Sequence, residues 1–263
     1  MTRVQWLKLK MFCHSPFLLV VLLLCLPQLD AQDLTVRSYN VWFDDRTGLD
    51  LRYRLILEDL SQADVDVICL QEVTPAFQRM IRERFRNSKF AIQGEVLEGY
   101  GNLTLTRLET VAQSYLRLPT RMQRKALKST VKTVSGNLVI YNVHLDSMLD
   151  DTERRIEQVK TILADGADKR FLIVGDFNFG DDEAEAKSLE RFTDPGRALK
   201  EPTFDIERNQ HAKLTRFEHE PSRRIDRIIS SQTIPQKDFR IFRNEHSDHF
   251  AIQSTVVLDR PGQ

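Results

Sequence analysis

Short apolar runs rich in β-branched residues recur along this chain, and most of them end in a small polar cluster. Residues 34–40 alternate apolar and polar side chains like a half-buried strand, residues 51–60 have the apolar spacing of a helix, and residues 65–70 form a second strand-like run. A chain that begins strand, helix, strand is expected to fold as an α/β domain. Further strand-like runs occupy residues 103–106, 138–143, 171–174, 225–229 and 250–257.

The length and composition favour one large domain. The chain has 263 residues, of which 41% are hydrophobic, and it contains neither an internal repeat nor a low-complexity linker. Helices are predicted at residues 75–85, 152–163 and 182–192, the last because acidic residues suit a helix N-terminus. The polar segment 194–224 carries two of the six histidines, so we expect a functional loop region there.

Residues 1–31 differ from the rest of the chain. Three basic residues precede an apolar run at residues 17–26, Pro27 breaks that run, and Ala31 offers a small residue for cleavage. The run is shorter than the roughly 20 residues that span a bilayer and matches a signal-peptide core. We expect a cleaved signal peptide at 1–31, a domain at 32–263, and a secreted, periplasmic or extracellular protein, with a retained membrane anchor as the alternative.

Charge and cysteine usage limit the partners and the covalent framework. Removal of residues 1–31 takes away three of the 38 basic and one of the 38 acidic side chains, which leaves a net charge of −2. That sign is wrong for a protein that binds nucleic acid by long-range attraction. Cys69 is then the only thiol, so an intrachain disulfide is excluded.

Polar clusters lie where the predicted strands end, which is where α/β proteins place their sites. Their carboxylates, carboxamides and histidines suit phosphodiester hydrolysis, because that reaction needs a hard cation, an activated water and donors to the phosphate oxygens. The clusters are Ser38-Tyr39-Asn40, Gln71-Glu72, His144-Leu145-Asp146, Gly175-Asp176-Phe177-Asn178 and Ser247-Asp248-His249.

In this order the clusters resemble the endonuclease/exonuclease/phosphatase superfamily, and the resemblance extends over residues 34–258. It implies a four-layer α/β sandwich, in which two packed β-sheets are flanked by helices. It also implies that Glu72 is the main ligand of a Mg²⁺ ion, which Mn²⁺ can replace, and that Asn40 and Asp248 assist. Asp176 would orient or deprotonate the attacking water.

The same resemblance assigns roles to residues around the phosphate. Asn178 would hold one phosphate oxygen and His249 would donate to another. Asp226, in the strand before, matches the aspartate that orients this histidine in relatives. The alternative for Asp226 is a salt bridge to Arg224 or Arg227. His144 is expected to line the site.

The chain is most similar within this superfamily to 5′-tyrosyl-DNA phosphodiesterase-like proteins, through residues 153–158, 203–205 and 224–228. It departs from that branch where Phe204 replaces a common tryptophan and where Phe179-Gly180 replaces a stretch that usually carries an arginine. The specificity for a 5′-tyrosyl group therefore stays open. Arg155 and Gln158 are interpreted as packing and helix-surface residues.

Substrate contacts are expected from aromatic and basic side chains. Tyr100 and Phe204 can contact the substrate, and a basic stretch can line a groove for a phosphate backbone. The alternative for that stretch is an exposed face. It consists of Arg117, Arg121, Arg124, Lys125 and Lys128.

Three functions remain open for such a chain. The first is a phosphodiesterase acting on nucleic acid, as a nuclease or on 5′-tyrosyl adducts, in a monomer without a stable protein partner. The second is a secreted phospholipid phosphodiesterase of the sphingomyelinase kind, for which membrane contact is expected. The third is a binding module that keeps the fold without the chemistry, and the complete set of site residues argues against it.

Overall fold

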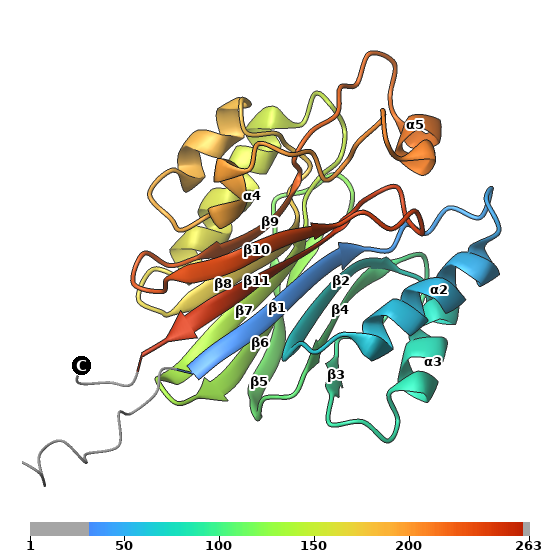
Figure 1. Cartoon of the computed structure of the whole chain (residues 1–263). Coiled ribbons are helices and arrows are strands. Elements are labelled where there is room, and N and C mark those ends of the chain that lie inside the picture. The colour runs from blue at the N-terminus through green and yellow to red at the C-terminus, as the bar shows by residue number, and fades with distance from the viewer. Residues whose placement is uncertain (1–31, 260–263) are drawn as a thin grey trace, which may run out of the picture. The chain divides into compact units, whose positions relative to one another are not determined.

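The computed structural model describes residues 32–259, which form two β-sheets with helices on their outer faces (Figure 1). The six-stranded sheet has the order β10-β11-β1-β2-β4-β3 and the five-stranded sheet the order β5-β6-β7-β8-β9. The strands are β1 Gln32–Asn40, β2 Val67–Val73, β3 Ala91–Gln93, β4 Gly101–Thr106, β5 Thr110–Arg117, β6 Lys125–Thr133, β7 Gly136–His144, β8 Phe171–Asp176, β9 Asp226–Ser230, β10 Gln236–Phe242 and β11 Ala251–Leu258.

The two sheets pack face to face over an apolar core. Alternate residues of each strand face the other sheet, as period-two alternation requires. Val36 of β1 and Val67 of β2 thus join Ile140 of β7 and Val174 of β8 in one buried cluster. The intervening residues face outward toward the helices, which makes the architecture a four-layer α/β sandwich and confirms the predicted fold.

Helices cover both outer faces. Helices α2 (Leu49–Gln62) and α3 (Pro75–Arg84) pack on the six-stranded sheet, and α4 (Thr152–Asp165) packs on the five-stranded sheet (Figure 1). Helix α3 begins as its sequence predicts, because Thr74 caps it by accepting a hydrogen bond from the backbone N–H of Phe77 and proline occupies its first turn.

The helix predicted at residues 182–192 is shorter and more tightly wound than expected. The structure has a 3₁₀ helix, η1 (Ala184–Leu189), at this place. Side chains of the segment are held by arginines of other elements, since Glu185 is fully buried against Arg155 and Glu183 accepts from Arg223. These ion pairs shape the backbone more strongly than helix propensity does.

Four strands have no clear signal in the sequence. Three of them, β3, β5 and β10, lie at sheet edges, where both faces are partly exposed and the apolar alternation is weak. The fourth, β6, joins the edge strand β5 to β7. The loop region 194–224 contains a 3₁₀ helix, η2 (Pro195–Ala198), and the short helix α5 (Gln210–Thr215).

The predicted leader at 1–31 lies outside the described residues and stays a prediction. Among residues 32–259, the helices are all too short or too polar to cross a bilayer.

Candidate active site

The core between the sheets becomes polar at one end. In β1, Val36 is followed at alternate positions by Ser38 and Asn40, and in β8 Val174 is followed by Asp176. These polar residues continue the inward-facing rows, so the strand pairing brings them together between the sheets. The group also includes Gln71, Asn142, His144 and Asp226, and each of its members is buried.

Strand register explains why residues distant in sequence meet at this end. His144 lies opposite Asp176 in the parallel pair β7–β8, and Asp176 lies opposite Asp226 in the antiparallel pair β8–β9. Residues 248 and 249 precede β11, which runs antiparallel to β1. Residues at the ends of β1 and β8 thus lie next to residues at the start of β9 and just before β11.

Glu72 reaches the site through an irregularity in β2. The register of β2 against β4 shifts between Leu70 and Val73, and Glu72 has a positive φ of 57°. In a regular strand Gln71 and Glu72 would face opposite sides of the sheet. The bulge allows the Glu72 carboxylate to turn toward Asn40 while Gln71 stays in the core. Nothing in the local sequence signals this bulge.

Asn142 of β7 supports the bulge from the other sheet. Its Nδ2 donates to the carbonyl oxygens of Leu70, at 3.2 Å, and of Leu103, at 2.8 Å, and its Oδ1 accepts from Gln71 Nε2 at 2.8 Å. Buried carbonyls freed by a bulge need such donors. Asn142 therefore acts as a clamp on the part of β2 that presents Glu72.

Asn40 links two carboxylates of the site. Its Nδ2 lies 3.1 Å from Oε1 of Glu72 and 3.0 Å from Oδ2 of Asp176, while its Oδ1 accepts from the backbone N–H of Trp42 at 3.1 Å. The N–H of Trp42 requires an oxygen, so the amide orientation follows from its partners. In this conformation Asn40 positions carboxylates, and its predicted role as a metal ligand stays a prediction.

His249 is paired with Asp226. Its Nδ1 lies 2.8 Å from Oδ2 of Asp226, and its Nε2 lies 3.8 Å from Oδ2 of Asp176. Burial alone lowers the pKa of His249, but the charges of Asp226, Asp176 and Asp248 outweigh it and raise the pKa well above the ordinary 6.5. His249 is therefore a cation near neutral pH, with Nε2 as its free donor.

The arginines next to Asp226 do not compete for it. Arg224 pairs with Asp181 and Asp194, and Arg227 also pairs with Asp181. The alternative of a salt bridge from Asp226 to either arginine is absent from the described residues.

His144 approaches the same oxygen of Asp176 as His249 and stays neutral. Its Nε2 is 3.5 Å from Oδ2 of Asp176 and 3.7 Å from Oε1 of Glu72. Burial, Arg124 and His249 hold its pKa well below 6.5. Arg124 approaches Nδ1 to 3.1 Å, and since an arginine only donates, His144 accepts there and carries its proton on Nε2.

The carboxylates of the site outnumber its cations. Burial raises the pKa of Glu72, and it raises the pKa values of Asp176 and Asp248 to about 6 from 3.8. With Asp226 they make four acidic groups, whereas the described cations at the site itself are His249 and Arg124; the charges of Arg46 and Arg52 act on Asp248 from the loop after β1 and from α2.

A divalent cation fits this excess of buried negative charge. Oxygen donors without a thiolate suit Mg²⁺ or Mn²⁺ better than Zn²⁺. One atom each of Asp176, Asp226 and His249 lie within 4.8 Å of one another, but the hydrogen bond between Asp226 and His249 already uses two of them. Glu72 and Asp248, two of the predicted ligands, stay the candidates to hold an ion, and among the described residues they are not part of a three-ligand cluster.

Asn178 and Asp248 lie at the border of the site. Asn178 donates one amide hydrogen to the carbonyl of Leu145 at 3.0 Å, which leaves its second hydrogen for another acceptor. Asp248 accepts from Thr215 Oγ1 of α5 at 2.9 Å. The loop region 194–224 is thus connected to the site through a residue that the sequence did not single out.

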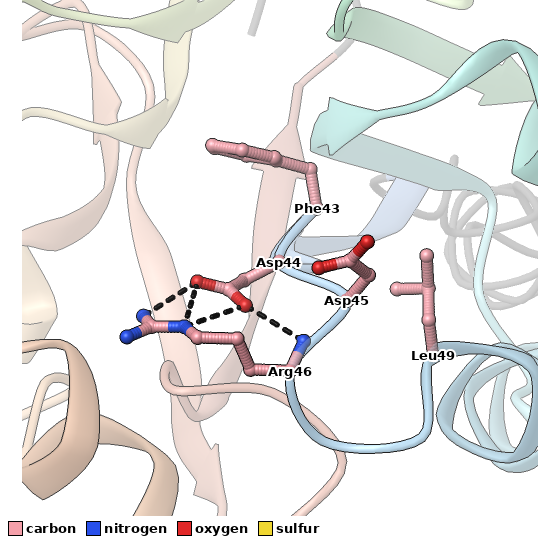
Figure 2. A pocket seen from close by; sticks show the side chains of 5 residues that line it. All are labelled: Phe43, Asp44, Asp45, Arg46 and Leu49. Atoms are coloured by element: carbon pink, nitrogen blue, oxygen red, sulfur yellow. Dashed lines mark hydrogen bonds and ion pairs between the residues drawn. The ribbon is translucent and has the colours of Figure 1, made fainter.

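The two aromatic residues predicted to contact substrate have different surroundings. Phe204 is buried and packs edge-on against the ring of His249, with centroids 5.6 Å apart, so it supports the histidine. Tyr100 is partly exposed, and its ring stacks on Phe43 with centroids 4.2 Å apart. Phe43, absent from the prediction, lines a surface pocket with Asp44, Asp45, Arg46 and Leu49 (Figure 2).

The predicted basic groove is not a continuous track. Arg121 pairs with Asp150 and Asp151, and Lys128 pairs with Asp165. Arg124 is buried and turns toward His144, with its guanidinium carbon 5.2 Å from the ring centre of Tyr100. Of this stretch, only Arg124 has a place beside the site.

Arg155 and Gln158 of α4 are buried, which agrees with their prediction as packing residues and not with a place on the helix surface. Gln158 accepts from the backbone N–H of Asp146, and Arg155 donates to the carbonyls of Asp146 and Met148. They hold the loop that follows His144. Their charge and polarity resemble those of surface residues, which is why the sequence alone did not reveal this role.

The fold and this buried acidic site define the class of protein. A sequence profile of the Endonuclease/Exonuclease/phosphatase family matches residues 38–249, and the chain belongs to that family. The curated relatives that it resembles are tyrosyl-DNA phosphodiesterase 2 proteins. That of Xenopus laevis is 26% identical over 163 residues, which cover 59% of this chain and 44% of the relative. That of Rattus norvegicus is 28% identical over 165 residues, covering 60% and 44%.

Solved structures share the fold. D. rerio TDP2 complexed with single strand DNA product has a TM-score of 0.71 and 24% identity, over 86% of this chain and 99% of that one. An endonuclease/exonuclease/phosphatase from Bacteroides vulgatus has a TM-score of 0.71 and 17% identity, over 87% and 100%. The chain spans less than half the length of the curated relatives above. Membership of the family therefore does not assign their activity to this chain.

Proposed function

We propose that this protein is a metal-dependent phosphodiesterase that hydrolyses phosphodiester bonds in nucleic acid. The observation that carries the proposal is the position of His249, which Asp226 holds as a cation and whose Nε2 lies 3.8 Å from Oδ2 of the buried Asp176. A cationic donor next to a carboxylate of raised pKa suits attack by water on a phosphate.

Each residue has a role in this mechanism. Asp176, whose pKa of about 6 suits a base near neutral pH, orients the attacking water and accepts its proton. His249 donates from Nε2 to a phosphate oxygen, and Asp226 keeps its ring oriented. Glu72 and Asp248 would hold a Mg²⁺ or Mn²⁺ ion, which supplies charge neutralisation at the phosphate when bound. Asn178 offers its free amide hydrogen to another oxygen.

Nucleic acid is the preferred substrate because the curated relatives are named as enzymes that act on tyrosyl-DNA. Specificity for a 5′-tyrosyl group is left to experiment, since Gly180 stands at the place where the branch usually carries an arginine. The nearest arginine there, Arg223, is paired with Glu183 and Glu220.

A phospholipid substrate is the second candidate. It is favoured by exposed apolar side chains in loops next to site residues: Met148 and Leu149 lie in the loop after Leu145, and Phe217 follows Thr215. Such side chains can enter a lipid interface.

We also propose that residues 1–31 are a signal peptide that directs the protein out of the cytosol, with a retained anchor as the alternative. N-terminal sequencing of the exported protein tests that proposal.

The test is an assay panel with Mg²⁺ on the protein and on Glu72→Gln. The substrates are single- and double-stranded DNA, RNA, a 5′-phosphotyrosyl oligonucleotide and sphingomyelin. We expect hydrolysis of a nucleic acid, and a loss of at least about 100-fold in kcat for Glu72→Gln, because a few kcal/mol of charge stabilisation is removed. Glu98→Gln, the same change at an exposed residue, serves as the matched control.

The panel separates the alternatives. Hydrolysis of sphingomyelin alone replaces the proposed substrate with a lipid. Hydrolysis of nothing, by a protein that remains folded and binds an oligonucleotide, supports the binding module. An activity that Glu72→Gln retains removes the proposed mechanism.

A further inference from the structure

Phe43 is an exposed aromatic residue fixed beside the site. Its side chain is 41% exposed, although its ring stacks on Tyr100 with an interplanar angle of only 9°. Its backbone N–H donates to Oε2 of Glu72 at 3.1 Å, so a hydrogen bond connects Phe43 to a carboxylate of the site. In Figure 2 its ring points away from the Asp44–Arg46 ion pair.

The loop that carries Phe43 is rigidly held. Arg52 of α2 is buried and donates through Nη2 to the carbonyls of Trp42 and Asp44, at 3.1 and 2.6 Å, and through Nη1 to that of His246 at 3.0 Å. Its guanidinium also lies over the ring of Trp42, 4.1 Å from the ring centre. These bonds fix the residues on both sides of Phe43, so its ring is preorganised for a ligand beside Glu72.

The neighbours of the ring indicate the kind of ligand. Tyr100 covers one face of Phe43, which leaves the other face for a further planar group. The pocket beside it is lined by three charged residues, Asp44, Asp45 and Arg46, which interrupt the apolar surface that a lipid interface needs. The free face of Phe43, in its parallel stack with Tyr100, can therefore receive one further flat ring.

We propose that Phe43 is the stacking platform for an unpaired nucleobase next to the scissile phosphate. This inference rests on the proposed function and names its substrate more closely, as single-stranded nucleic acid or an unpaired end. In a duplex the base faces are covered by neighbouring base pairs, so only an unpaired base can stack on the ring. Because every base has such a face, the platform accepts any base sequence.

The experiment is a double-mutant cycle, in which the ring of Phe43 and a base of the substrate are removed separately and together. The substrate is a single-stranded tetranucleotide in which only the central linkage is a hydrolysable phosphodiester and the others are methylphosphonates. Analogues carry an abasic sugar on the 5′ or on the 3′ side of that linkage. KM and kcat are measured for the unchanged protein and for Phe43→Leu, Phe43→Trp and the control Tyr115→Leu, whose aromatic residue in β5 is exposed to a similar extent at 43%.

We expect Phe43→Leu to raise KM about 5- to 100-fold, as base stacking on aromatic side chains predicts, while Phe43→Trp and Tyr115→Leu stay near the unchanged protein. The abasic analogue on one side should raise KM for the unchanged protein by a similar factor. For Phe43→Leu the same analogue should cause no further rise in KM, because both changes remove the same contact between ring and base.

Other outcomes overturn the proposal and are distinguishable. If the tetranucleotide is hydrolysed and Phe43→Leu and the abasic analogues leave KM unchanged, the platform is absent while the proposed function stands. If the protein cleaves no nucleic acid, the proposed function fails and the platform fails with it. Binding of phosphatidylcholine–phosphatidylserine vesicles that is lost in Phe43→Leu, without any effect on the oligonucleotide, assigns the ring to a membrane surface instead.

Discussion

The imidazole Nδ1 of His249 lies 2.8 Å from Oδ2 of Asp226, although 23 residues separate them in the sequence. Both side chains are buried, and the contact leaves Nε2 directed toward Asp176 at 3.8 Å. The pair therefore determines both the charge of the His249 ring and the direction of its Nε2 donor.

Replacement of Asp226 by asparagine should disable this donor without unfolding the protein. We expect kcat to fall by roughly 10²- to 10⁴-fold, because the amide neither stabilises the imidazolium nor enforces its tautomer. The pKa of His249, measured by NMR titration of its ring without metal, should fall. Asp64→Asn, at an exposed aspartate, is the control. An unchanged histidine pKa would contradict the role of Asp226.

Removal of divalent metal should abolish activity. Burial and, to a smaller extent, the charge of Glu72 raise the pKa of Asp248 to about 6, so without a cation the two carboxylates are costly to ionise together. Excess EDTA should stop turnover, Mg²⁺ or Mn²⁺ should restore it, and either ion should raise the melting temperature. Full activity in EDTA would exclude the metal-dependent mechanism.

Asp248→Asn should change how stability depends on pH. In the metal-free folded protein the pKa of Asp248 is about 6, against 3.8 ordinarily, so between these values the folded state binds more protons than the unfolded chain. Its contribution to the unfolding free energy is thus present below about pH 3.8 and is lost as the pH rises through about 6.

The variant Asp248→Asn has no carboxyl group at this position, so it does not lose this unfolding free energy as the pH rises. In EDTA we expect the melting temperature of Asp248→Asn, relative to the unchanged protein, to increase by several degrees between about pH 4 and pH 7, since 1 kcal/mol corresponds to roughly 2 to 4 °C at this size. A constant difference across that range in calorimetric scans would show that Asp248 does not titrate with a raised pKa.

Asn142→Ala should impair catalysis through Glu72. The variant leaves the carbonyls of Leu70 and Leu103 without their donor, which should lower the unfolding free energy by about 1 to 3 kcal/mol. Relaxation of the bulge should also weaken Mg²⁺ binding, measured by calorimetric titration of the folded variant. A variant that is less stable but binds Mg²⁺ normally would limit Asn142 to a structural role.

Thr215→Val should test the connection between α5 and Asp248. The substitution keeps the shape and removes the hydroxyl that donates to Asp248 at 2.9 Å. We expect a loss of stability of about 1 kcal/mol and a fall in kcat of roughly 5- to 20-fold, with recovery in Thr215→Ser, which keeps the donor. Equal kinetics for the valine and serine variants would show that the hydrogen bond has no part in turnover.

The sequence by itself determined the alternation of the central strands and the polar residues that end them. The pattern predicted an α/β domain with Asn40, His144 and Asp176 at strand ends, and strand alternation explains why the structure places them on the face of Val36 and Val174. The four-layer sandwich and the roles of the site residues were predicted from the resemblance to the superfamily.

The tertiary structure alone decided how these residues interact. The bulge that presents Glu72 depends on Asn142, 72 residues after the carbonyl of Leu70 that it clamps, and the inward turn of Arg124 depends on His144 in the adjacent strand. The stack of Phe43 on Tyr100 joins two loops far apart in the chain. Periodicity specifies the face toward which a side chain points, whereas its partner is set by strand register and by the packing of one sheet on the other.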